Sequence, residues 1–163
     1  MGGPTALMGL LCAVLPLEGQ STGKAGAGAA NWHQWRGPEA NGVSRTATPP
    51  TTWSEKDNIR WKVEIAGKGG ATPIVWGDKV FITQATDADK RRTVMCFDKR
   101  TGELLWRSGV THAKKETTHK TNPYCSGSPA TDGRIVVANF ASAGVAAYDL
   151  DGQQLWYRDL GPQ

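Results

Sequence analysis

The sequence has little of what helical bundles, zinc proteins and many enzymes require. Apolar residues repeating at positions i, i+3, i+4 and i+7 are absent after residue 30, which argues against a helical bundle. Its three cysteines fit no zinc-ligand spacing, and it contains no G-x-S-x-G, no H-E-x-x-H and no phosphate-binding glycine loop. What the sequence has instead is 20 glycines and 7 tryptophans, a combination that favours short strands joined by tight turns.

The charge of the chain gives no reason to expect a nucleic-acid partner. The formal net charge is only +4, and basic residues are interleaved with acidic ones along most of the sequence. Such interleaving is typical of a solvated surface.

The first residues resemble an export signal more than a part of the fold. Residues 6–17 form an apolar run of 12, too short for a bilayer, which requires about 20 residues. Small residues that suit a cleavage site follow at 25–29, although no Lys or Arg precedes the run. We expect residues 1–27 to be a signal peptide and 28–57 an N-terminal extension. The mature chain would then have no transmembrane span, and the protein would be exported to the periplasm or cell envelope.

An internal repeat predicts the architecture. Trp61, Trp106 and Trp156 occupy similar segments, 45 and 50 residues apart, and this period suits a propeller blade of four strands. We therefore predict an all-β β-propeller of four-stranded antiparallel blades: a blade-closing strand at 58–65, a blade at 71–110 and a blade at 127–160. About two of an expected seven or eight blades are then present. The C-terminal blades would be missing, unless a short chain completes its ring by oligomerising.

The turn before each repeated tryptophan has a physical rationale. In Asp98-Lys-Arg-Thr101-Gly102, the carboxylate and the hydroxyl can accept backbone N–H bonds, and the glycine supplies a left-handed conformation. The second copy, from Asp149 to Gly152, keeps Asp and Gly but is one residue shorter and has no Thr.

The stretch from Cys96 to Trp106 resembles the tryptophan-docking motif of quinoprotein-type (PQQ-like) propellers, and residues 147–156 resemble it more loosely. The opening, residues 32–43, is also similar to the start of exported propellers of this kind. WD40 propellers would show Trp-Asp and kelch propellers repeated paired glycines, and this chain has neither. The resemblance implies that each indole stacks on the turn of the next blade. The implied structural set is Trp61, Asp98, Thr101, Gly102, Trp106, Asp149, Gly152 and Trp156.

One face of the propeller should carry a rim of cationic and polar loops. The loop between the second and third strands and the long blade-joining loop share that face, and loops on a rigid scaffold often bind ligands. The candidate residues are Lys90, Arg91, Arg92, His112, Lys114, Lys115, His119, Lys120 and Asn122. The alternative is a solvated rim without a ligand. A single His119 is weak evidence for a metal, and we predict no metal site.

Two functions follow from the resemblance. The first is a non-catalytic interaction platform for exported or envelope proteins, similar to propellers that assemble outer-membrane proteins, and it needs no cofactor. The second is a dehydrogenase that carries pyrroloquinoline quinone with Ca²⁺. The dehydrogenase is disfavoured because the chain has no adjacent cysteines and no carboxylate that matches the catalytic base. Whether Cys96 and Cys125 pair stays open, and burial as two small apolar residues is the favoured alternative.

Overall fold

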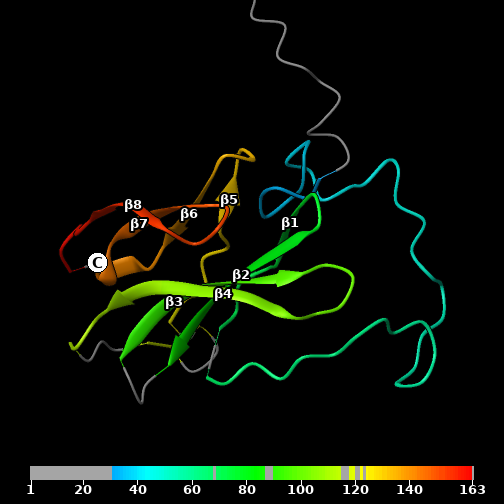
Figure 1. Ribbon diagram of the computed structural model, residues 1–163, viewed down its shortest axis with the longest axis horizontal. Coiled ribbons are helices and arrows are strands. Elements are labelled where there is room, and N and C mark those ends of the chain that lie inside the picture. Colours follow the sequence, from blue (N-terminus) through cyan, green and yellow to red (C-terminus); the bar gives the residue numbers. More distant parts are fainter. Residues whose placement is uncertain are drawn as a thin grey trace, which may run out of the picture.

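The fold was analysed in a computed structural model, which describes residues 31–67, 69–86, 90–114, 118–119, 122 and 124–162. It contains two four-stranded antiparallel sheets that lie side by side (Figure 1). The first consists of β1 (Ile74–Trp76), β2 (Lys79–Thr86), β3 (Arg91–Asp98) and β4 (Leu104–Thr111), in the order β1-β2-β3-β4. The second consists of β5 (Ala130–Thr131), β6 (Ile135–Asn139), β7 (Val145–Asp149) and β8 (Gln154–Arg158), in the order β5-β6-β7-β8, with a 3₁₀ turn, η1 (Ala141–Ala143), between β6 and β7.

The two sheets are two propeller blades, which confirms the all-β prediction. The sheet of β1–β4 is called blade 1 and the sheet of β5–β8 is called blade 2. Each blade connects neighbouring strands in sequence order, so every blade is a simple up-and-down meander. Both blades also carry a register shift at the same place, between Cys96 and Phe97 and between Ala147 and Tyr148. Within the described residues, no helix is both long and apolar enough to cross a bilayer.

The core lies between the blades. In blade 1, Ile74, Phe81, Cys96 and Trp106 stand in register across the four strands and therefore share one face. The first three are completely buried, and they pack with side chains of the second blade such as Tyr148. The alternation of the strands thus turns one face of blade 1 toward blade 2.

The segment expected to be a blade-closing strand differs from the prediction. Residues 58–65 are not assigned as strand. A strand needs a ladder partner, and no described strand pairs with this segment. Figure 1 shows that the chain between residues 43 and 60 loops away from both sheets.

Candidate functional site

The indole of Trp106 joins blade 1 to a turn of blade 2. Its Nε1 donates a hydrogen bond of 3.0 Å to the carbonyl oxygen of Leu150, one residue after Asp149. The ring lies so close to Gly152 that a β-carbon there would come within 2.6 Å of it. Gly152 therefore has no room for a side chain, and its φ of 88° also favours glycine.

Trp61 makes the same contact one blade earlier. Its Nε1 donates a 2.9 Å hydrogen bond to the carbonyl oxygen of Lys99, one residue after Asp98. A β-carbon on Gly102 would lie 2.7 Å from the Trp61 ring. The two indoles thus use equivalent atoms of successive turns, and Trp61 reaches its acceptor without being part of a strand.

The turn beneath Trp61 is held by its aspartate. Oδ1 of Asp98 accepts hydrogen bonds from the backbone N–H groups of Arg100 at 2.7 Å and Thr101 at 2.9 Å. These bonds lower the pKa of the carboxyl group, because they favour its charged form. In the shorter turn, Oδ1 of Asp149 accepts from the N–H groups of Asp151 and Gln153, at 3.0 and 2.8 Å.

A third indole contact was missed by the sequence analysis. Trp76, at the end of β1, lies against Gly133 in the β5–β6 turn, where a β-carbon would overlap its ring. This contact joins the inner strands of the two blades, whereas Trp106 joins the outer ones. The matching Gly-Asp and Asp-Gly hairpins were visible in the sequence, but nothing there showed that Trp76 spans from one to the next. The remaining predicted indole, Trp156, is 39% exposed on β8.

Polar contacts reinforce the junction between the blades. Lys79 Nζ donates to the Leu150 carbonyl oxygen at 2.8 Å and lies 3.2 Å from Oδ1 of Asp151. The hydroxyl of Ser108 donates to the Gly152 carbonyl oxygen at 2.5 Å. The Thr83 hydroxyl reaches back to the joining loop, where it lies 3.0 Å from the carbonyl oxygen of Cys125.

The structure describes most of the predicted rim residues. The backbone N–H of His112 donates to the carbonyl oxygen of Lys90 at 2.8 Å, so the β2–β3 turn and the blade-joining loop do meet on one face. Lys90 and Lys114 are exposed, and His112 is half-buried. His119 and Asn122 are exposed and share a backbone hydrogen bond of 2.9 Å. Lys115 and Lys120 lie outside the described residues.

Arg91 and Arg92 correct the predicted extent of this loop. Both belong to β3, and only residues 87–90 separate β2 from β3. Arg92 is 3% exposed, so it is not part of a solvated rim. It points toward blade 2, and its guanidinium lies 4.0 Å above the centre of the Tyr124 ring. The alternation of β3 buries this cation, and a cation–π contact with the joining loop offsets part of its desolvation.

A cleft of about 430 Å³ lies where the rim meets blade 2. Two predicted rim residues, His112 and Lys114, line it together with residues that the sequence analysis did not select. The full lining is Thr111, His112, Ala113, Lys114, Ser142, Tyr157, Asp159, Gly161 and Pro162. The cleft therefore offers a cation, a carboxylate, hydroxyls and an aromatic ring to a ligand. Ser142 and Asp159 had no signal in the sequence, since η1 and the segment after β8 meet the joining loop only through the fold.

The structure shows how the two cysteines of the blades and the side chains that could bind a metal are arranged. No group of three His, Cys, Asp or Glu side chains lies together among them. Cys96 and Cys125 are free and buried rather than paired. Burial raises the pKa of the two thiols, to about 11 and about 12 respectively, which disfavours their reactive thiolate forms.

Comparisons with known proteins identify the family of the chain. A comparison with curated proteins found no significant match. A family model described as outer membrane protein assembly factor BamB matches residues 43–163, which include both blades and the Trp61 segment. The match starts after the segment 31–37 and covers most of the chain. By its sequence and its two four-stranded blades, the chain belongs to this family of PQQ-repeat β-propellers.

Proposed function

We propose that the protein is a non-catalytic, exported propeller that serves as an interaction platform for proteins of the cell envelope. The observation that carries the proposal is the family match, since its description names an outer membrane protein assembly factor. The partner we propose is therefore a component of outer-membrane protein assembly. Export is part of the proposal and is supported by the apolar run at residues 6–17.

We also propose that Trp61, Trp106 and Trp156 are docking residues that hold consecutive blades at a fixed angle. Two indole-to-carbonyl bonds of equal placement, at 2.9 and 3.0 Å, support this role for Trp61 and Trp106. A rigid ring is what a platform requires, because loops on it can then present side chains in a constant arrangement.

The cleft beside Lys114 is the contact surface that we propose for the partner. It lies at a junction between two blades, and its mixed polar lining suits a polypeptide, which offers both donors and acceptors. Charged groups on an exposed rim chiefly influence association rates and specificity.

A photo-cross-linking experiment on the full-length protein tests the proposal. A photoreactive residue at Lys114 should give adducts with a component of the outer-membrane assembly machinery. The same residue at Arg134, whose side chain is 87% exposed in the β5–β6 turn at the opposite end of the blades, is the control. Equal adducts from the two positions, or none from Lys114, would contradict the proposed surface.

The dehydrogenase alternative stays a prediction with its own assay. Full-length protein would be mixed with pyrroloquinoline quinone, Ca²⁺, an alcohol and a redox dye. Dye reduction that requires both the quinone and Ca²⁺ would support the enzyme and contradict the platform. Quinone binding without turnover would not contradict the platform.

A further inference from the structure

Residues 31–37 lie against both blades at once. The backbone N–H of Val75 in β1 donates to the carbonyl oxygen of Trp32 at 2.8 Å. The backbone N–H of Thr131 in β5 donates to the carbonyl oxygen of the next residue, His33, at 3.0 Å. One dipeptide therefore satisfies donors on the first strands of two blades.

The direction of these bonds locates the dipeptide. Carbonyl groups of successive residues in an extended segment point to opposite sides. Trp32 and His33 therefore lie between β1 and β5, on the edges of these strands that do not pair with β2 and β6. Since first strands of propeller blades border the central channel, residues 31–33 would lie on the axis side of a complete ring.

The contacts of this segment are specific for its sequence. Oδ1 of Asn31 accepts a 2.7 Å hydrogen bond from the N–H of Gly77 in the β1–β2 turn. The His33 ring meets the Trp76 ring edge to face, with centroids 6.2 Å apart. Trp32 folds onto Gly37, which is buried, has a φ of 74° and leaves no space for a β-carbon. Each of the three side chains thus has a defined place.

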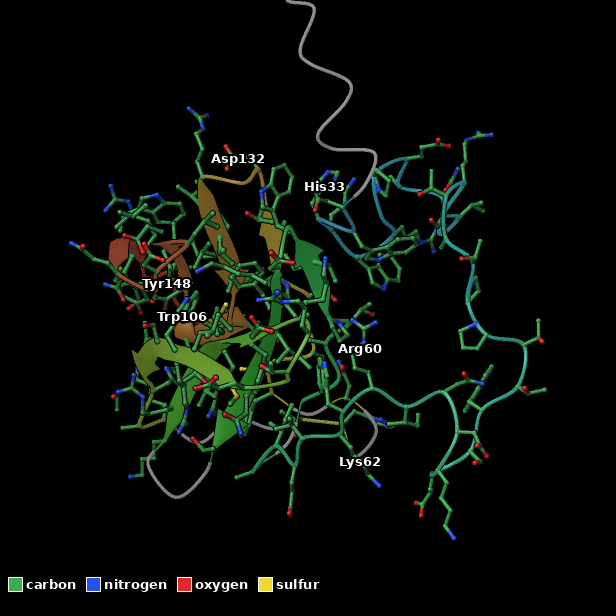
Figure 2. All side chains as sticks on the ribbon, turned by 45° about the vertical axis from the view of Figure 1, so that its right-hand side comes forward. His33, Arg60, Lys62, Trp106, Asp132 and Tyr148 are labelled. Carbon is green, nitrogen blue, oxygen red and sulfur yellow. The ribbon has the colours of Figure 1, made fainter. Side chains whose placement is uncertain are left out.

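These contacts also show at which end of the blades the segment lies. Trp76 and Gly77 lie at the end of the blades that carries the β1–β2 and β5–β6 turns, which is the end opposite the rim. In Figure 2, His33 lies toward the same end of the molecule as Asp132, which is in the β5–β6 turn. The cleft beside Lys114 is formed by loops of the other side.

We propose that the edges of β1 and β5 that face away from β2 and β6, together with Trp76, form a binding site for an extended peptide. Its occupant is the chain's own segment 31–37, which closes the turn-side mouth of the channel next to the first two blades. A ligand of the channel would then enter from the rim. Segment 31–37 is called the strap below. The family model matches residues 43–163, so the strap lies outside the part of the chain that the model covers. The proposal rests on the strap contacts and is independent of the proposed function.

Amide hydrogen exchange on the full-length protein tests the strap. The N–H groups of Val75 and Thr131 should exchange slowly, because they donate to the strap. Trp32→Ala should speed their exchange by about tenfold or more, because it removes the packing that holds the strap. The matched control is Trp35→Ala, since Trp35 is 59% exposed and should leave both amides unchanged.

A peptide supplied in trans gives a second, independent readout. A protein that lacks residues 31–37 should bind a synthetic peptide of residues 29–40 saturably and recover slow exchange at Val75 and Thr131. The intact protein should not bind it, because its own strap fills the site.

Two results would overturn the proposal. One is equally fast exchange of both amides in the intact and the Trp32→Ala proteins. The other is equal peptide binding, or none, by a folded deletion variant and the intact protein. If the deletion variant does not fold, the pair Trp32→Ala and Trp35→Ala decides the question.

Discussion

Replacing Trp106 by alanine should lower the free energy of unfolding by about 3 kcal/mol. Truncating a fully buried tryptophan costs about 3–5 kcal/mol, and Trp106 is only partly buried, so the lower end applies. Its ring packs against Phe81 and Tyr148, at centroid distances of 5.9 and 6.3 Å, and against Gly152. These contacts span both blades, so their loss weakens the junction rather than one sheet.

The hydrogen bond from the indole contributes a smaller part of the effect. Trp106→Phe keeps much of the ring packing and should cost about 1 kcal/mol for the lost bond. The Leu150 carbonyl oxygen is not left without a donor, because Lys79 Nζ also donates to it at 2.8 Å. Trp53, which is 69% exposed, supplies the matched control, and Trp53→Ala should change stability by less than about 0.5 kcal/mol.

Equilibrium urea unfolding followed by circular dichroism measures these differences without depending on tryptophan fluorescence. The expected order of destabilisation is Trp106→Ala, then Trp106→Phe, then Trp53→Ala. Equal costs for Trp106→Ala and Trp53→Ala would refute the assignment of Trp106 to the blade junction.

Three further predictions concern the turns and the thiols. Gly133→Ala should destabilise by about 1–3 kcal/mol more than Gly42→Ala in thermal or urea melts, because both positions have positive φ but only Gly133 lies against an indole; equal losses would exclude the clash. The pKa of Asp98 is lowered in the folded state, so its carboxylate stabilises the fold above the unfolded pKa and this stabilisation disappears as the pH falls below about 4. Asp98→Asn should therefore destabilise at pH 7 and progressively less toward pH 3, whereas a constant difference would contradict the linkage. Because burial raises the pKa of Cys96 and Cys125, iodoacetamide at pH 8 should modify them only after unfolding, as mass spectrometry of native and urea-treated protein would show.

The fold was predictable because its signals are local and repeated. A hairpin turn, a turn begun by aspartate and a tryptophan recur in order, so strand number and pairing follow from one repeat copied twice. The segment 58–65 shows the limit of this reasoning. Its sequence matches the tryptophan strands, yet strand formation depends on a neighbour that the repeat pattern alone does not supply.

The site was less predictable because it depends on which faces meet. Arg92 was assigned to the candidate rim loop because charge and position favour exposure, but the alternation of β3 turns it inward onto Tyr124. Ser142 and Asp159 join His112 and Lys114 across the blade junction, at sequence separations that no local motif encodes. The backbone hydrogen bonds of Trp32 and His33 are equally non-local, since their donors lie on the first strands of two different blades.

The hydrogen bonds of the indole junctions use only the backbone of the accepting blade. The acceptors are the carbonyl oxygens of Lys99 and Leu150, and the surface beneath each ring is a glycine. The hydrogen bond and the glycine contact do not require a particular side chain from the neighbouring blade, so we expect this part of the junction to tolerate changes of sequence as long as the turn keeps its glycine. Gene duplication can therefore lengthen such a protein one blade at a time without inventing a new interface. The same property makes chimeric propellers, with blades taken from different family members, a practical route to new rim surfaces.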